Sequence, residues 1–505
     1  MEKVIRRALV SVYHKEGLAE ILKLLHEQGV EFVSTGGTST FIEGLGYPCV
    51  AVEDLTKYPS MLGGRVKTLH PAIQGGILAR RGHETDQKEV LEYGLSLIDL
   101  VIVDLYPFEA TVASGASEED IIEKIDIGGI SLIRGAAKNF EDVVIIPSQA
   151  DYATLLEILR ERGARTTLEE RRHFARRAFA VSSHYDSAIF RYFDAEDHSA
   201  LRLTADEAKP LRYGENPHQK GVFYGDLDRY FEQLHGKELS YNNLQDVEAA
   251  VSLIQDFSEP TFAILKHNNA CGCASRPTLL EAWTDALAGD PVSAFGGVLV
   301  ANRPIDVATA REIDKLFLEV LIAPDFEAEA LTILEGKKNR ILLRQKEAID
   351  ARWSYRSMLG GVLAQETDRA VETTAEMKPV TKVAPTAEEL TDLVFATKLV
   401  KHSKSNAIVL SKGGQLIASG VGQTSRVDAL KQAIEKARHF GFDLKGAVLA
   451  SDAFFPFDDC VTLAAEAGII AIAQPGGSVR DADSIAAADR LGVAMVMTGV
   501  RHFKH

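Results

Sequence analysis

The chain has 505 residues, of which 46% are hydrophobic and 25% are charged. This is an ordinary globular composition, with a length that suits about three domains. The formal net charge of −16 argues against a nucleic acid partner, because a phosphate backbone requires a basic protein surface. Small anionic substrates need only a local cluster of cations, so this class stays open.

Membrane insertion and secretion are not expected. The chain lacks an apolar run long enough for a transmembrane helix, and residues 1–7 lack the apolar core of a signal peptide. The cysteines are too few and too scattered for a disulfide framework: Cys49, Cys271, Cys273 and Cys460. We therefore expect a cytoplasmic protein.

Apolar segments alternate with helical patterns through residues 1–195. Strands are predicted at 7–12, 31–34, 49–52, 97–105 and 143–146, and helices at 17–28, 39–45 and 167–193. Because strands separated by helices form parallel sheets, we predict a βαβ arrangement. Two aperiodic or proline-flanked segments predict domain boundaries, which give domains at 1–198, 199–372 and 373–505.

Three polar clusters in the first domain are candidates for chemistry. Ser34-Thr35-Gly36-Gly37-Thr38 lies between a strand and a helix, where unpaired N–H groups bind anions, although a tight turn explains it equally well. The loop at 63–71 carries Arg65 and Lys67 on one side if it is extended, which suits a phosphate or an oxyanion better than a solvated loop. Asp126 opens a helical pattern that ends at Lys138, and it could be only a cap.

The dipeptide Lys266-His267 follows the apolar run 261–265 and precedes a turn. We expect a buried strand that delivers both side chains to its carboxyl edge, where open α/β sheets place their chemistry. An ammonium beside an imidazole favours the neutral, basic ring. The alternative is a strand end with two solvated residues. The same dipeptide recurs at Lys401-His402 at the end of a helical pattern, where cations have a structural explanation.

Segments 290–297 and 451–457 are similar small, acidic and aromatic turns, which hints at duplication of one α/β unit.

Longer motifs run along the whole chain. Residues 1–195 contain STGGT at 34–38, GGRVKTLHP at 63–71, LYPF at 105–108 and IDIGG at 125–129. Residues 200–505 contain LRYGENPHQ at 211–219, KH at 266–267, SAFG at 293–296, SN at 405–406, GQTSR at 422–426 and SDAFFPF at 451–457. In these motifs the chain resembles the family of bifunctional purine-biosynthesis enzymes that combine AICAR transformylase with IMP cyclohydrolase.

The resemblance implies two successive reactions. A formyl group moves from 10-formyltetrahydrofolate to the amino group of AICAR, and the product, FAICAR, closes to IMP with loss of water. It also implies a methylglyoxal-synthase-like α/β domain followed by two cytidine-deaminase-like α/β/α units. Members of the family are homodimers with transformylase sites at the subunit interface. No catalytic metal is required, and a structural monovalent cation is possible.

Functional residues follow by match to the family motifs. In the transformylase, His267 is the base, Lys266 stabilises the oxyanion and Asn406 binds the formyl oxygen or the folate. Anchors and pocket residues are Arg212, Tyr213, Gly296, Glu319, Arg426, Phe455, Asp459 and Arg501. In the cyclohydrolase, Lys67 leads, with Tyr106, Asp126 and Lys138 as orienting or proton-handling partners. The phosphate and substrate contacts are Lys15, Thr35, Gly36, Gly37, Thr38, Arg65 and Thr68.

The sequence fits two other classes of protein less well. A zinc deaminase requires His-x-Glu and Pro-Cys-x-x-Cys, whereas the chain has only Cys271-Gly272-Cys273 with the wrong spacing. A nucleotide-binding regulatory protein would need the anion site at 34–38 but not Lys266, His267 and Asn406. Intact binding without turnover would favour that second class.

Overall fold

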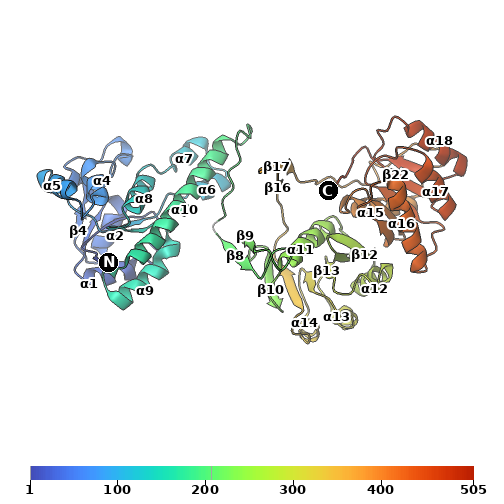
Figure 1. Ribbon diagram of the computed structural model, residues 1–505, viewed down its shortest axis with the longest axis horizontal. Helices are drawn as coiled ribbons and strands as arrows, with labels where there is room; N and C mark the ends of the chain where they lie inside the picture. Colours follow the sequence, from blue (N-terminus) through green and yellow to red (C-terminus); the bar gives the residue numbers. More distant parts are fainter. Residues whose placement is uncertain (1, 206) are drawn as a thin grey trace. The chain divides into compact units, whose positions relative to one another are not determined.

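The computed structural model describes residues 2–205 and 207–505, and they form two compact units divided at position 206 (Figure 1). In the described residues, no helix is long and apolar enough to cross a membrane.

The first unit is built on a parallel sheet with the strand order β4-β3-β2-β5-β6. The predicted strands and their parallel arrangement are confirmed. The strands are β1 (Lys3–Val4), β2 (Arg7–Ser11), β3 (Glu31–Ser34), β4 (Cys49–Ala51), β5 (Leu100–Val103), β6 (Val144–Ile146) and β7 (Arg165–Thr166). Strands β1 and β7 pair separately from the main sheet.

Helices of the first unit pack on this sheet, and the long α10 runs beside α8 (Figure 1). They are α1 (Leu18–Glu27), α2 (Gly36–Gly44), α3 (Val52–Thr56), η1 (Leu62–Gly64), α4 (Pro71–Leu78), α5 (Glu84–Glu92), α6 (Phe108–Ala113), α7 (Glu118–Ile122), α8 (Gly128–Lys138), η2 (Gln149–Asp151), α9 (Tyr152–Arg162) and α10 (Leu168–Phe193). Thr167 and Glu170 form a capping box that starts α10 where the sequence predicts. The helix predicted at 39–45 begins three residues earlier, at Gly36, so the glycine cluster itself forms its first turn.

The second unit contains one mixed sheet with the order β10-β15-β14-β13-β11-β12-β20-β19-β21-β22-β23-β18, and two separate hairpins, β8–β9 and β16–β17. Its strands are β8 (Ala208–Leu211), β9 (Gly221–Tyr224), β10 (Phe231–His235), β11 (Thr261–Lys266), β12 (Asn269–Ser275), β13 (Val298–Ala301), β14 (Val320–Ala323), β15 (Ile341–Gln345), β16 (Trp353–Met358), β17 (Gly361–Glu366), β18 (Lys378–Pro379), β19 (Ile408–Lys412), β20 (Gln415–Gly420), β21 (Val448–Ser451), β22 (Ala471–Gln474) and β23 (Ala494–Met497).

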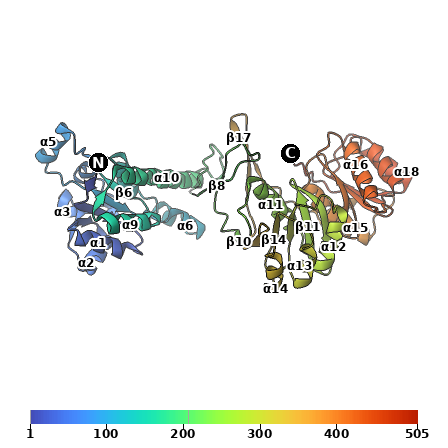
Figure 2. The same cartoon turned by 60° about the horizontal axis from the view of Figure 1, so that its bottom comes forward.

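Eight helices are distributed evenly between the two halves of this sheet, drawn green to yellow and orange to red in Figure 2. They are α11 (Tyr241–Ile254), α12 (Leu279–Gly289), α13 (Val307–Ile313), α14 (Ala328–Leu334), α15 (Ala387–Lys401), α16 (Arg426–His439), α17 (Asp459–Ala467) and α18 (Asp481–Leu491).

The two halves repeat one topology. In each, a helix leads into an antiparallel hairpin (β11–β12 or β19–β20), and the first strand of the hairpin pairs with a run of three parallel strands. The predicted duplication is therefore present, but the two segments that suggested it are not equivalent. Segment 290–297 precedes β13, whereas 451–457 follows β21, its counterpart.

Candidate active sites

The first candidate site lies at the carboxyl edge of the parallel sheet, around the N-terminus of α2. The Thr38 hydroxyl donates to the Val12 carbonyl at 3.0 Å. The Lys15 ammonium donates to the same carbonyl at 2.9 Å and to that of Tyr13 at 2.8 Å. A cation therefore lies beside unpaired helix N–H groups, which together form a cradle for an anion.

Lys67 reaches the same cradle from the loop before α4. Its ammonium would lie 3.5 Å from a Cβ added at Gly36, and its Cε only 2.6 Å from one added at Gly64. Glycine at position 64 therefore makes room for the lysine, whereas a Cβ at position 36 would only contact it. Arg65 forms an ion pair with Glu123, and its side chain is 67% exposed. Of the two predicted cations, the structure thus directs Lys67 to the cradle.

Asp126 lies where α8 begins, beside the end of β5. Its Oδ1 accepts the Gly129 N–H at 2.6 Å, so the carboxylate caps the helix. The Thr68 hydroxyl lies 3.1 Å from a Cβ added at Gly128, which places Thr68 against the same turn. Burial, together with the charge of Asp104, raises the pKa of Asp126, and main-chain hydrogen bonds oppose this rise. The structure thus places the Asp126 carboxyl, whose pKa is raised, at the same turn as the Thr68 hydroxyl that the sequence predicts for this site.

Tyr106 belongs to an aromatic cluster that sequence patterns did not reveal. Its ring contacts that of Tyr13 edge-on, with 5.6 Å between centroids. The Lys124 ammonium lies over both rings, 5.4 Å from the centroid of Tyr13 and 5.7 Å from that of Tyr106. Burial and the nearby charge of Asp126 raise the pKa of the Tyr106 phenol. The phenol therefore stays protonated at neutral pH and can donate a hydrogen bond.

The structure does not bring Lys138 to this cluster. Lys138 is the last residue of α8, about 15 Å along the axis from Gly128, which lies beside Asp126. Its neighbour Asn139 donates to the carbonyls of Ile77 and Ala79, at the far end of α4. Lys138 is thus separated from Asp126 by the length of α8, and its role in ring closure stays a prediction.

In the second unit, Lys266 and His267 lie at the tip of the β11–β12 hairpin. The expected strand is present, but both neighbours of β11 are antiparallel to it, so it is not a strand of a parallel sheet. The Lys266 ammonium donates to the Phe295 carbonyl at 2.7 Å, next to the predicted Gly296. His267 and Asn268 form the two-residue turn with φ values of 51° and 65°. This left-handed backbone costs a residue with a side chain about 1–2 kcal/mol relative to glycine, although asparagine and histidine adopt it more often than most residues.

The equivalent turn in the second half of the sheet has glycine at both positions, where a left-handed backbone is relaxed. Gly413 and Gly414 connect β19 to β20 with φ values of 57° and 66°. The two turns thus have nearly the same backbone, with glycines in one and His267-Asn268 in the other. Glycine at position 267 would relieve the backbone strain. The histidine found there therefore favours a functional role for this turn over a strand end with two solvated side chains.

Asp246, on α11, supports the strained turn. Its Oδ1 accepts the Asn268 N–H at 2.7 Å. Burial raises the pKa of the Asp246 carboxyl, while the charges of His267 and Lys266 lower it. Sequence reasoning missed Asp246 because it lies 22 residues from its partner, outside any motif.

Asn406 lies close to this turn through the loop that precedes β19. Asn269 receives the Lys404 N–H on its side-chain oxygen at 3.1 Å and donates to the His267 carbonyl at 2.8 Å. The Asn406 amide donates to the Gln423 carbonyl at 3.0 Å. The structure therefore brings His267 and Asn406 to the same edge of the sheet.

Other predicted residues line the same edge. Arg426 pairs with the buried Asp452 at 3.2 Å, and Arg501 lies over the Phe503 ring at 4.4 Å. Asp459 begins α17, and Glu319 pairs with Lys237 at 2.6 Å. Phe455 is an exception, because its side chain is 0% exposed. Its ring packs in the core, and its place at the border of the substrate pocket stays a prediction.

Comparisons with known proteins match both units of the chain. The family model AICARFT/IMPCHase bienzyme matches residues 136–436, and the model MGS-like domain matches residues 17–131. The bifunctional purine biosynthesis protein PurH of Bacteroides thetaiotaomicron is 67% identical over 100% of this chain and 99% of its own length. The chain belongs to the AICARFT/IMPCHase bienzyme family.

Other relatives agree with this assignment. The PurH proteins of Chloroflexus aurantiacus and Chlorobium luteolum are 48% and 46% identical, each over 100% of this chain and at least 99% of their own length. The crystal structure of ForH matches 37% of this chain and 99% of its own at 34% identity, with a TM-score of 0.32. The chain is thus a bifunctional enzyme of purine biosynthesis, an AICAR formyltransferase and IMP cyclohydrolase that carries out the last two steps of IMP synthesis.

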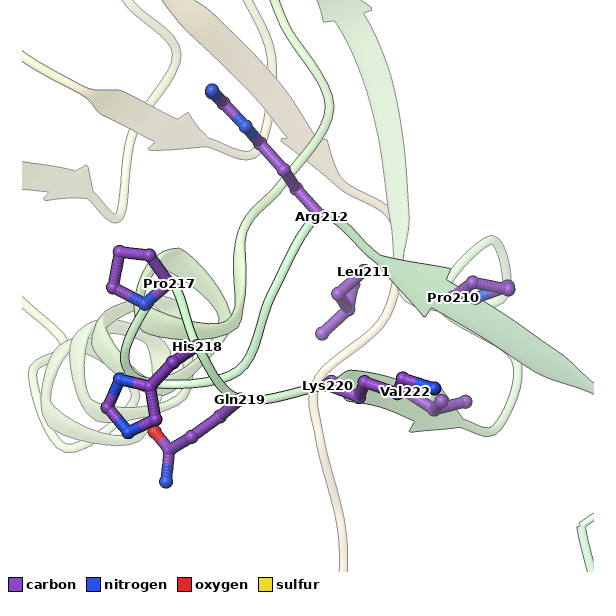
Figure 3. Close-up of a pocket in the computed structure, with 9 residues that line it drawn as sticks. Pro210, Leu211, Arg212, Pro217, His218, Gln219, Lys220 and Val222 are labelled. Carbon is purple, nitrogen blue, oxygen red and sulfur yellow. The ribbon is translucent and has the colours of Figure 1, made fainter.

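Arg212 and Tyr213 of this bienzyme lie in the loop between β8 and β9. Residues 210–212 and 217–222 line a pocket of about 310 Å³, in which Arg212 extends away from His218 (Figure 3). The loop is held to α11, because Asn242 donates to the Glu215 carbonyl at 3.2 Å. Among the described residues, no hydrogen bond or ion pair joins Arg212 or Tyr213 to His267, so their role as anchors stays a prediction.

The contacts of Lys401 and His402 agree with a structural role for that dipeptide. Both side chains bind the partly buried Asp256, at 2.9 and 2.7 Å. Cys271 and Cys273 lie in the buried strand β12, and burial raises the pKa of Cys271 to about 12. In residues 2–205 and 207–505, no group of His, Cys, Asp and Glu side chains is arranged to hold a metal.

Proposed function

We propose that the first unit closes FAICAR to IMP and that the second transfers the formyl group, with domains at 1–198, 199–372 and 373–505. The second region would consist of two cytidine-deaminase-like units, in agreement with its repeated topology. The turn at His267-Asn268 is the observation that carries the assignment of the second unit. Its φ values are close to those of Gly413-Gly414 in the equivalent turn, where glycine avoids the strain that histidine accepts.

In formyl transfer, the AICAR amino group attacks the formyl carbon of 10-formyltetrahydrofolate. His267 takes the proton of that amino group as the new C–N bond forms, and the bond to the folate nitrogen then breaks. Lys266 stabilises the negative charge on the formyl oxygen, and Asn406 binds the same oxygen or the folate. The roles of Arg212, Tyr213, Gly296, Glu319, Arg426, Asp459 and Arg501 in binding remain proposals.

In ring closure, the carboxamide nitrogen of FAICAR attacks the formyl carbon of the same molecule. Because both groups lie on one ring, the enzyme mainly orients them and moves protons. Lys15, Lys67 and the N-terminus of α2, which includes Thr35, Gly36, Gly37 and Thr38, would hold the phosphate and the developing charge. Tyr106, Asp126 and Thr68 would orient the reacting groups and handle protons, with Arg65 nearby.

We further propose that the enzyme is a cytoplasmic homodimer. Glu319 and Asp452 lie on the same sheet edge, but the strands beside them are separated by six strand spacings, or about 29 Å. One small pocket cannot span that distance, which supports transformylase sites completed by a second copy. A structural monovalent cation is also compatible with the chain, since Asp452 Oδ2 is buried without a hydrogen-bond partner among the described residues.

The decisive experiment incubates the protein with AICAR and 10-formyltetrahydrofolate and follows FAICAR and IMP. Lys67→Ala should accumulate FAICAR, whereas His267→Ala should not form it. Lys23→Ala, which removes an exposed lysine of α1, is the control and should behave like the wild type. Production of IMP at the wild-type rate by both site variants would reject the assignments, and binding without turnover by the wild type would reject catalysis.

A further inference from the structure

A histidine and an aspartate form a pair at the carboxyl edge of the first sheet, outside the predicted site residues. His14 Nδ1 lies 2.6 Å from Asp104 Oδ2, and the His14 N–H donates to the same oxygen at 2.8 Å. His14 follows β2 and Asp104 follows β5, and these strands are neighbours. The carboxylate is thus fixed by the fold and orients the ring from both its main chain and its side chain.

The pair lies between the two parts of the proposed cyclohydrolase site. On one side, the next residue is Lys15, whose ammonium lies in the anion cradle. On the other side, the His14 ring contacts Tyr13 at 4.8 Å between centroids, and Tyr13 contacts Tyr106. A substrate with its phosphate in the cradle and its reacting groups near Tyr106 would pass the imidazole.

The contacts of the ring also define its chemistry. An ionised carboxylate can only accept a hydrogen bond, so Nδ1 carries the proton that Asp104 receives. In the neutral ring, Nε2 then carries a lone pair, and among residues 2–205 this nitrogen has no hydrogen-bond partner. The charged groups around it are Asp104, Glu16 and Lys15, with Lys124 over the Tyr13 ring. A carboxylate that orients an imidazole with a free nitrogen suits a general base.

We infer that His14, oriented by Asp104, is a catalytic residue that carries protons in ring closure. This inference rests on the proposed function. As the carboxamide nitrogen bonds to the formyl carbon, Nε2 takes one of its two protons, and the former carbonyl oxygen is protonated to a hydroxyl. The formylamino nitrogen then loses its proton, a C=N bond forms and the C–O bond breaks. The protons lost from both nitrogens end on the departing oxygen, so the products are IMP and one water.

The test compares two variants with FAICAR as the substrate. His14→Ala removes the ring, whereas His14→Asn keeps a donor in the position of Nδ1 and removes only Nε2. Both should lower kcat for ring closure about a hundredfold with little change in KM. Free imidazole should raise the rate of the alanine variant at least tenfold, which a purely structural residue would not show. Formyl transfer to AICAR reports that the chain is folded.

The matched control is His83→Ala, because His83 Nδ1 also binds an aspartate, Asp86, at 2.9 Å, but on α5. It should keep the wild-type rate with or without imidazole. Ring closure at the wild-type rate by His14→Ala would overturn the inference, as would full activity of His14→Asn. If the wild-type protein itself formed no IMP from FAICAR, the proposed function would fail instead.

Discussion

The left-handed backbone at His267 costs conformational free energy. A similar backbone at Gly413, its counterpart in the other half of the sheet, does not. A side chain in the left-handed region costs about 1–2 kcal/mol, which glycine avoids. Gly413 has nearly the same φ as His267, so its turn is formed without that cost. The chain therefore gives up stability at the turn that carries the proposed base.

This difference predicts that glycine at position 267 relaxes the turn but abolishes formyl transfer. His267→Gly should be more stable than His267→Ala by about 1 kcal/mol, because only glycine relaxes the turn. Both variants should lose formyl transfer and keep ring closure. Urea unfolding gives the stability, and separate assays of the two reactions give the activities. A glycine variant less stable than the alanine variant would contradict the role of strain.

Lys67 and Lys138 allow a second prediction at the scale of single residues. Lys67 lies at the anion cradle, whereas Lys138 is at the other end of α8 from Asp126. Lys138→Ala should therefore close FAICAR within about twofold of the wild type, and Lys67→Ala should lose about a hundredfold. Steady-state assays with FAICAR measure both. Equal losses would show that Lys138 reaches the substrate by a route absent from this structure.

At the scale of elements, a buried histidine anchors the C-terminal segment. His502 is 2% exposed, and its two ring nitrogens lie 2.7 Å from Asp368 and 2.8 Å from Glu372. Burial opposes the charged ring, but the two carboxylates outweigh it and raise the pKa of His502 to about 9. The segment that carries Arg501 is thus held by a charged imidazole.

The pH dependence of stability follows from this shift. Because the folded pKa of about 9 exceeds the usual histidine value of about 6.5, the contribution is complete below about pH 6.5 and is lost as pH rises through 9. Wild type should exceed His502→Gln by on the order of 3 kcal/mol at pH 6 and by much less at pH 9.5. Both tryptophans, Trp283 and Trp353, lie in the second unit, so their fluorescence in urea reports its unfolding. A difference independent of pH would contradict this account.

At the scale of the whole molecule, the β16–β17 hairpin is exposed along both of its strands. The strands pair only with each other, and apolar side chains such as Val362 and Leu363 face solvent, with Leu363 57% exposed. A two-stranded hairpin is only marginally stable alone in water. We therefore expect a second copy of the chain to cover it in the proposed homodimer.

A charge on this hairpin should separate the two activities. Leu363→Asp should shift the dimer towards monomer and lower formyl transfer at least tenfold, because a buried unpaired carboxylate is costly. Ring closure should stay within twofold, since the first unit contains its proposed site. Light scattering after gel filtration measures the mass. Leu91→Asp, at an exposed leucine of the first unit, is the control, and a dimeric, fully active Leu363→Asp would contradict the expectation.

Local sequence could predict the parts of this fold that depend on local patterns. Buried parallel strands such as Leu100–Val103 form continuous apolar runs, and the capping box at Thr167 marks the start of α10. The antiparallel partners of β11 could not be predicted, because the same apolar run fits a parallel strand. His14 and Asp104 are 90 residues apart, so only the pairing of β2 with β5 brings them together.

The relaxed turn at Gly413-Gly414 has a consequence for how the enzyme could fail. It shows that this hairpin folds well without a histidine, so a chain that lost His267 would still reach its native shape. Proteases and chaperones remove unfolded chains, and such a copy would escape them. In a homodimer with shared sites, it would pair with intact copies, and each mixed dimer would keep a single intact His267. A point mutation here would therefore leave half-active dimers at full abundance, whereas a mutation that unfolds the chain would lower the amount of enzyme.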